Sequence, residues 1–155
     1  MIETVTTVTP ELMDALARLL PQLSDMPLPQ RAHLAEMLAD PHTRLFVARD
    51  EAGAIVGMLT LVVYRIPTGT HAVIEDVVVD ADQRGQGFGA ALTRMALDEA
   101  VRMGAGVVDL TSRPSRTAAN RLYRRLGFTQ RETNAYRYMI NPAGEHGRGG
   151  DLGVE

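Results

Sequence analysis

The hydrophobic positions of the chain change their spacing several times, which predicts an alternation of strands and helices. Residues 2–8 alternate apolar and polar side chains, a pattern typical of a half-buried strand. Thr9 and Pro10 then supply an N-cap and a first helical residue, and the leucines that follow fall on one helical face. After a proline-rich stretch, a second helix is predicted over about 30–39.

Shorter apolar runs in the middle of the chain predict strands. Two of them, 44–49 and 54–64, are separated by turn-forming residues at 50–53, which indicates an antiparallel pair. A second turn at 67–69 leads into a β-branched run at 73–79. We therefore expect three consecutive strands, the last of them mostly buried.

The second half of the chain predicts a helix-rich region. A long helix has an apolar stripe that ends near Met103, with Gly104 as its C-cap. The further predictions are a strand at 107–110, a helix at 115–126 closed by Gly127, and two last strands within 128–140 around Glu132–Asn134. Residues 141–155 are rich in glycine and charge, so we expect one domain over 1–140 and a disordered tail after it.

The stretch from Val73 to Ala90 combines carboxylates with a glycine cluster. Glu75 and Asp76 interrupt the buried strand, and three glycines alternate with other residues where the next helix must begin. Glycine lets the backbone approach a ligand closely, and free N–H groups at a helix N-terminus attract phosphate. This pattern indicates a phosphate-binding turn beside two carboxylates.

Known glycine motifs differ from this turn in specific ways. A P-loop requires a lysine after its glycines, and none follows here. The dinucleotide fingerprint is formally matched by Gly85, Gly87 and Ala90, but it follows its strand directly, whereas residues 80–84 intervene here. A tight turn without a ligand is the structural alternative.

Two motifs resemble the GCN5-related N-acetyltransferase (GNAT) superfamily. Arg84-Gly-Gln-Gly-Phe-Gly89 matches its Arg/Gln-x-x-Gly-x-Gly/Ala signature, and 118–128 is similar to its second motif, which ends Leu-Tyr-x-x-x-Gly-Phe. The similarity spans roughly 45–140. It implies an α/β fold with a mixed, mostly antiparallel twisted sheet of six to seven strands. About four helices would flank this sheet, which would be splayed between the central strand and the next.

The resemblance also implies acetyl-coenzyme A as co-substrate, with its pyrophosphate on the glycine turn and helix start. Backbone N–H groups of the central strand would meet the thioester carbonyl and the pantetheine arm. The residues expected to bind the co-substrate are Val77, Val78, Val79, Arg84, Gly85, Gln86, Gly87, Phe88, Gly89, Ala90, Asn120 and Tyr123. Many relatives have an asparagine where Arg116 stands, and Asn120 is a candidate substitute.

Glu75 is a candidate general base. Acetyl transfer needs a neutral amine, and a primary alkylamine with a pKa of about 10.4 is mostly protonated at neutral pH. The resemblance places Glu75 and Asp76 where glucosamine-6-phosphate acetyltransferases have Ile-Glu-Asp. Either carboxylate could be the base, and strand alternation places the two on opposite faces unless a bulge intervenes. The structural alternative is a buried ion pair with Arg113 or Arg116.

Tyr123 is the candidate general acid. The departing coenzyme A thiolate needs a proton donor, which a phenol can supply, and the resembling motif has its acidic tyrosine at this position. The alternative is an aromatic side chain that only packs in the core. The arginines around this helix fit a solvated face and contact with coenzyme A phosphates about equally well: Arg113, Arg116, Arg121, Arg124 and Arg125.

Composition narrows the chemistry further. The 155 residues carry a net charge of −3, which argues against nucleic acid as a partner. With no cysteine there is neither a thiolate metal site nor a cysteine nucleophile, and His33 and His71 lack metal-ligand spacing, so no metal is expected. No apolar run has the length of a membrane span and no signal peptide is visible, so a cytoplasmic location is expected.

These observations predict an N-acetyltransferase that moves acetyl from acetyl-coenzyme A directly to an amine, either a small molecule or a peptide. The alternative is a non-catalytic acyl-coenzyme A-binding or sensor module of the same fold. Relatives of this kind are often homodimers, so a homodimer is also considered.

Overall fold

The computed structural model describes residues 1–140, and residues 141–155, with the tail predicted there, lie outside the described part. The strands are β1 (Ile2–Val5), β2 (Thr43–Arg49), β3 (Ile55–Ile66), β4 (Gly69–Val79) and β5 (Val107–Leu110). The helices are α1 (Pro10–Leu19), α2 (Arg31–Ala39), α3 (Phe88–Arg102) and α4 (Thr117–Arg125), with short 3₁₀ turns η1 (Leu20–Gln22) and η2 (Ala81–Gln83).

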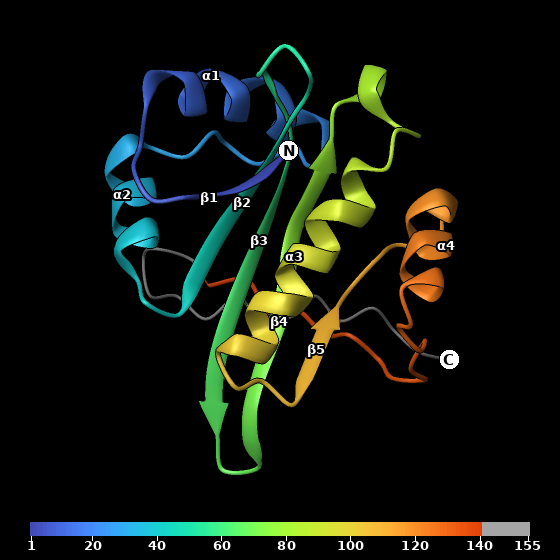
Figure 1. Cartoon of the computed structure of the whole chain (residues 1–155). Coiled ribbons are helices and arrows are strands. Elements are labelled where there is room, and N and C mark those ends of the chain that lie inside the picture. Colours follow the sequence, from blue (N-terminus) through green and yellow to red (C-terminus); the bar gives the residue numbers. More distant parts are fainter. Residues whose placement is uncertain (141–155) are drawn as a thin grey trace.

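The strands form one five-stranded sheet in chain order, β1-β2-β3-β4-β5 (Figure 1). The pairs β1–β2, β2–β3 and β3–β4 are antiparallel. Short turns join β2 to β3 and β3 to β4, whereas α1 and α2 lie between β1 and β2. β5 pairs parallel to β4, which requires a crossover, and α3 provides it.

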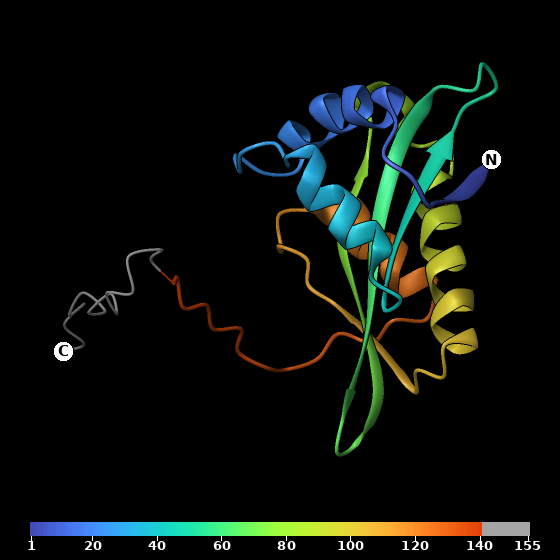
Figure 2. The same ribbon diagram turned by 90° about the vertical axis from the view of Figure 1, so that its left-hand side faces the viewer.

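Helices cover both faces of the sheet, and strand alternation assigns side chains to two separate cores. On β2, Phe46 and Ala48 belong to the cluster that α3 covers, whereas Leu45 and Val47 belong to the cluster beneath α1 and α2. Figure 2 shows this layering, with α1 and α2 on one side of the sheet and α3 on the other. The alternation is the period-two pattern of a strand buried on both faces.

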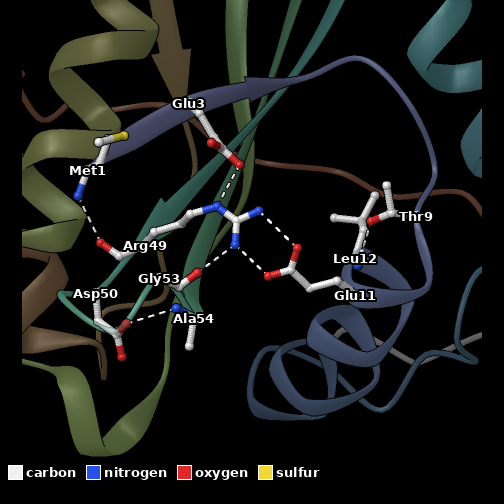
Figure 3. Close-up of polar contacts among 9 residues, drawn as sticks. All are labelled: Met1, Glu3, Thr9, Glu11, Leu12, Arg49, Asp50, Gly53 and Ala54. Carbon is white, nitrogen blue, oxygen red and sulfur yellow. Dashed lines mark hydrogen bonds and ion pairs between the residues drawn. The ribbon is translucent and has the colours of Figure 1, made fainter.

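Arg49 ties the N-terminal strand and α1 to the end of β2 (Figure 3). Its guanidinium donates to Glu3 at 2.8 Å, to both carboxylate oxygens of Glu11 at 2.5 and 3.0 Å, and to the carbonyl of Gly53 at 2.6 Å. Helix α1 begins where Thr9 and Pro10 predict, and Thr9 Oγ1 accepts from the backbone N–H of Leu12 at 3.1 Å.

Most elements agree with the sequence-based predictions, but the two last strands do not. Five strands are present within residues 1–140 where six to seven were expected, although the fold is the one implied. Residues 129–140 are all exposed and contain no strand. Thr129 to Asn134 are all polar, so the first of the two predicted strands has no apolar face to bury. The second contains Tyr136, Tyr138 and Ile140, but these side chains remain exposed.

No helix among residues 1–140 is long and apolar enough to cross a membrane.

Candidate functional site

A β-bulge in β4 lies at the two carboxylates. Thr60 of β3 pairs with Glu75 and Met58 pairs with Val78, so two residues of β4, Asp76 and Val77, face one residue of β3. Asp76 has a φ of 52°, the one non-glycine residue with positive φ in the described part of the chain. Such backbone strain persists only where the surrounding structure enforces it, and it is common at functional sites.

The bulge determines where the carboxylates point. Residues directly opposite in an antiparallel pair share a face, so Glu75 lies on the same face as Thr60. That face is the one covered by α1 and α2, because Leu59 and Leu61 belong to the α3 core and Thr60 alternates with them. Glu75 therefore faces the side of the sheet that α2 covers, and the bulge re-aims Asp76.

Both carboxyl groups have environments that favour the protonated form. Desolvation raises the pKa of Glu75, the charge of Asp76 adds to the increase, and Arg137 opposes it. Desolvation also raises the pKa of Asp76. No ion pair within residues 1–140 includes either group, so the predicted alternative of a salt bridge to Arg113 or Arg116 is absent there. Carboxylates held without a cationic partner are candidates for proton transfer.

β4 and β5 separate just before the bulge. Their pairing ends at Ile74 and Leu110, whereas β4 continues to Val79. Backbone amides of 75–79 that point toward β5 therefore have no ladder partner on that side within residues 1–140. Val78 packs into the core beneath α1 and α2, and Val77 and Val79 pack on the α3 core, so the side chains fix the strand while part of its backbone stays available.

The glycine turn follows η2 and opens α3. Gly85 and Gly87 have φ values of 80° and 88°, a region that only glycine adopts without strain, and a Cβ built on either would meet nothing within 4 Å. Gly89 has a different reason, because its Cβ would lie 3.3 Å from Leu122 Cδ2. Thus two glycines shape an open turn, and the third lets α3 approach α4.

The start of α3 has the properties of an anion site. Its N-cap, Gly87, provides no side-chain hydrogen bond, and its first turn contains no acidic residue. The N–H groups at Phe88, Gly89 and Ala90 belong to the first helical turn, which has no intrahelical acceptors. The space beside Gly85 and Gly87 is open, and the first turn of α3 offers backbone N–H donors, so this arrangement fits a pyrophosphate.

The polar side chains of the glycine turn make hydrogen bonds within the turn region. Arg84 Nε donates to the carbonyl of Val79 at 3.2 Å, and Gln86 Nε2 donates to Gln83 Oε1 at 2.9 Å. Phe88 is half-buried and packs against the α3 core. These contacts leave phosphate binding in this turn mainly to the backbone.

Tyr123 lies on the buried side of α4 with 9% of its surface exposed. Its ring meets Phe128 edge-on, with centroids 5.8 Å apart. Burial raises the pKa of its hydroxyl above the usual value near 10, and the charge of Arg116 acts in the opposite direction. The phenol therefore stays protonated at neutral pH, as a proton donor must.

Asn120 stabilises the loop that precedes α4, because its Nδ2 donates to the carbonyl of Arg113 at 3.0 Å. Four of the five arginines around α4 are exposed, namely Arg113, Arg121, Arg124 and Arg125. Arg116 is half-buried and donates from Nη2 to the carbonyl of Leu23 at 3.1 Å.

Two features at this end of the sheet were not found from the sequence. Ser112 follows β5, and its Oγ is buried without a hydrogen-bond partner in the described part of the chain. Arg116 was considered as a member of a basic cluster, as an ion-pair partner of Glu75 and as the residue in place of a family asparagine, but its contact with Leu23 was not foreseen. The available signal was strand alternation, which continues from Val108 and Leu110 to Ser112 and places a hydroxyl on the apolar face.

A hollow of about 240 Å³ lies elsewhere, beside β1 and α1, and is lined by Glu3, Glu11 and Arg49 among others. The guanidinium of Arg49 is already paired with both of these carboxylates. We therefore assign this hollow a structural role.

Comparison with known proteins agrees with the resemblance in the motifs. A family model described as "Acetyltransferase (GNAT) family" matches residues 10–128. An uncharacterized N-acetyltransferase of Methanocaldococcus jannaschii is 38% identical over 61 residues, which are 39% of this chain and 27% of that protein. The match thus spans about a quarter of the length of that relative.

Two solved structures extend the similarity to nearly the whole chain. A putative acetyltransferase from Agrobacterium tumefaciens is 27% identical with a TM-score of 0.77, over 90% of this chain and 99% of that one. An aminoglycoside acetyltransferase from an uncultured soil metagenomic sample is 25% identical with a TM-score of 0.77, over 90% of this chain and 94% of that one.

Proposed function

Because the chain belongs to the GNAT acetyltransferase family, we propose that it transfers an acetyl group from acetyl-coenzyme A directly to an amine. The observation that carries this proposal is the end of β4. There a bulge, two carboxyl groups of raised pKa and a strand edge without a partner lie ahead of an open glycine turn. A general base, thioester-binding amides and a pyrophosphate site are the components that direct transfer requires.

In this proposal the glycine turn and the first turn of α3 hold the pyrophosphate, and amides of residues 77–79 hold the thioester carbonyl. Acetyl-coenzyme A supplies the activated acyl group. Glu75, directly or through water, accepts a proton from the amine as nitrogen bonds to the carbonyl carbon. The carbon–sulfur bond then breaks, and Tyr123 gives its proton to the departing sulfur. The absence of cysteine from the chain supports direct transfer, because there is no thiol to carry the acetyl group.

Glu75 is preferred to Asp76 because register places its side chain on the face of the sheet that α1 and α2 cover, while the strained backbone at Asp76 shapes the bulge. Asp76 raises the pKa of Glu75 by its charge, which strengthens Glu75 as a base. The acceptor class is an amine. The aminoglycoside acetyltransferase among the similar structures makes aminoglycosides one part of a test panel, beside small amines and peptide N-termini.

The direct test combines acetyl-coenzyme A binding by calorimetry with thiol release in the presence of the amine panel. We expect binding and amine-dependent release of coenzyme A. Binding without release for any amine would instead identify an acyl-coenzyme A-binding module. Absence of binding would remove both functions.

A pH series separates the two catalytic roles. Glu75→Gln keeps the shape of the side chain and removes its basicity, so kcat/KM should fall most near neutral pH and partly recover at high pH, where the amine loses its proton unaided. Tyr123→Phe removes only the hydroxyl, so turnover should fall by roughly 10²-fold without such recovery. The measurement is kcat/KM against pH for both variants.

Parallel profiles for the two variants would contradict the division of roles. A silent Glu75→Gln beside an inactive Asp76→Asn would move the base to the neighbouring carboxylate. Acetyl-coenzyme A affinity serves as the control, since neither substitution touches the glycine turn.

A further inference from the structure

Arg116 joins two parts of the molecule that are far apart in sequence. It is the N-cap residue of α4, and its guanidinium donates to the carbonyl of Leu23, 93 residues away, at 3.1 Å. Leu23 is the C-cap residue of η1, from which the chain leads to α2. The connection between α1 and α2 is therefore held against the connection between β5 and α4, and Figure 2 shows these two loops next to each other.

The segment 24–30 has few other restraints. Met26 and Leu28 are 71% and 50% exposed, so their side chains do not fix the segment by burial. Pro27 and Pro29 have no backbone N–H to donate. Within residues 1–140, the Arg116–Leu23 bond is the one hydrogen bond that connects 23–30 to an element remote in sequence. Other restraints act only at its ends, where Leu23 packs on the core beneath α1 and α2, Gln22 Oε1 accepts from the N–H of Ala81, and Arg31 donates to the carbonyl of Val8. Arg116 adds the one long-range hydrogen bond to this connection, so we infer that its loss loosens the segment.

The segment lies on the side of the sheet where an acceptor must arrive. It leads directly into α2, and α2 packs on the face that Glu75 shares with Thr60. The glycine turn belongs to the start of α3, which covers the other face. A change in 24–30 should consequently affect whatever approaches Glu75 and leave the pyrophosphate site intact.

Arg116 also acts on α4. It stands seven residues before Tyr123, two helical turns along the same face, or roughly 10 Å at the usual helical rise. Its positive charge favours the phenolate of Tyr123 and lowers the pKa that burial raises. The same side chain therefore contacts the α1–α2 segment and influences the helix that carries the candidate acid.

We propose that Arg116 is a positioning residue that fastens segment 24–30 at the acceptor side of the site and thereby sets the affinity for the acceptor. This inference rests on the proposed function, because it takes Glu75 as the place where the amine arrives. Its role differs from phosphate binding, which the exposed arginines of α4 are free to serve, since its guanidinium is already committed to a carbonyl on the opposite loop.

The test compares Arg116→Met, which keeps the aliphatic length without charge or donor, with Arg116→Lys, which keeps a charge and one donor. Arg65→Met, at an exposed arginine near the β3–β4 turn, is the control for loss of one positive charge. We expect Arg116→Met to raise the acceptor KM roughly tenfold, the size of one hydrogen bond from a charged donor. The acetyl-coenzyme A Kd should change less than about twofold.

Hydrogen exchange at the amides of 24–30 gives a readout that does not depend on catalysis. It should become faster in Arg116→Met, partly recover in Arg116→Lys and stay unchanged in Arg65→Met. The acceptor KM should follow the same order, with kcat falling less than KM rises. If Arg116→Met does not fold, the lysine variant alone decides, because its smaller expected change remains measurable in both readouts.

Three outcomes would overturn the inference. Unchanged exchange and unchanged acceptor KM would show that the bond does not position the segment. An increase in the acetyl-coenzyme A Kd with a constant acceptor KM would make Arg116 a phosphate ligand. Faster exchange with a constant acceptor KM would show that segment 24–30 does not affect acceptor binding. If the wild type binds acetyl-coenzyme A but acetylates no amine, the proposed function fails, and the exchange data still decide whether Arg116 holds the segment.

Discussion

At Gly87 the backbone enters α3 with a φ of 88°, and the same positive φ recurs at Gly104, just after that helix ends, with a value of 81°. Neither glycine has an atom of another residue within 4 Å of a built Cβ. The two positions are thus alike in backbone strain and in space. They differ in what lies in front of them, because only Gly87 belongs to the turn proposed to bind pyrophosphate.

This likeness provides a matched pair of substitutions. Gly87→Ala and Gly104→Ala should each cost about 1–3 kcal/mol of stability, because alanine is strained at positive φ. Gly87→Ala alone should weaken acetyl-coenzyme A binding, by roughly tenfold or more, since its Cβ enters the space that a phosphate would use. Thermal unfolding and calorimetric titration measure the two effects. Equal acetyl-coenzyme A affinities in the two variants would show that the glycine turn is not part of the binding site.

Glu75 allows a second prediction at the scale of a single residue. Its pKa is raised, mainly by desolvation, so the folded protein carries an unfavourable charge at neutral pH. Glu75→Gln should therefore raise Tm at pH 7. The gain should shrink as the pH falls through the raised folded pKa, because the wild-type group then becomes neutral as well. A variant that is less stable than the wild type at pH 7 would show that the carboxylate stabilises the fold.

At the scale of elements, α3 packs tightly on β3 and β4 around Gly57. A Cβ on Gly57 of β3 would lie 3.1 Å from the backbone carbonyl of Val78 and 3.3 Å from Leu92 Cδ1. The backbone atom cannot move aside without shifting β4. Gly57 therefore lets α3 lie close to the sheet at the level of the bulge and the glycine turn.

The prediction for these elements is that Gly57→Ala destabilises the protein by about 1–3 kcal/mol through overpacking. Gly106, just before β5, is the control, because its φ is not positive and a Cβ there would meet nothing within 4 Å. Gly106→Ala should be neutral or more stable by up to about 1 kcal/mol. Denaturant unfolding of both variants decides the matter. Equal stabilities would mean that α3 tolerates the displacement.

Over the whole molecule, two carboxylates link α1 to distant parts of the sheet. Glu11 binds Arg49 at the end of β2, and Asp80, just after β4, binds Arg18 Nε at 2.9 Å. The hydrogen bond from each arginine lowers the pKa of its carboxylate partner. Glu11 is exposed, and the half-buried Asp80 pairs with an exposed Arg18, so each contribution is modest and sensitive to salt.

The sign of the pH effect follows from these lowered values. The unfolded groups titrate near 4.3 and 3.9 for Glu and Asp, respectively, so their stabilisation is complete above those values and disappears as the pH falls through the lower folded pKa values. A double variant, Glu11→Gln with Asp80→Asn, should therefore be less stable than wild type at pH 7 and nearly equal to it once the pH is below the lowered folded pKa values. Urea midpoints between these limits test this expectation. A constant difference at every pH would exclude the two ion pairs as its source.

The sequence by itself determined the elements up to residue 128 and the family. Thr9 and Pro10 are residue types that favour a helix start, and they mark the beginning of α1. Gly104 and Gly127 adopt positive φ and mark the ends of α3 and α4. These signals are local, so no knowledge of partners is needed to interpret them. The prediction of the two last strands was wrong, because a strand also depends on a partner strand. Neither the polar residues 129–134 nor the apolar side chains after them pair with the sheet within residues 1–140.

Only the tertiary structure decided how the site is assembled. The sequence left open whether Glu75 and Asp76 face apart, because a bulge depends on the register with β3, which sets Thr60 against Glu75 and Met58 against Val78. It could not distinguish Arg116 from the four exposed arginines near it, since its partner is a carbonyl 93 residues away. Register and long-range contacts arise from the packing of the whole chain, and no local pattern specifies them.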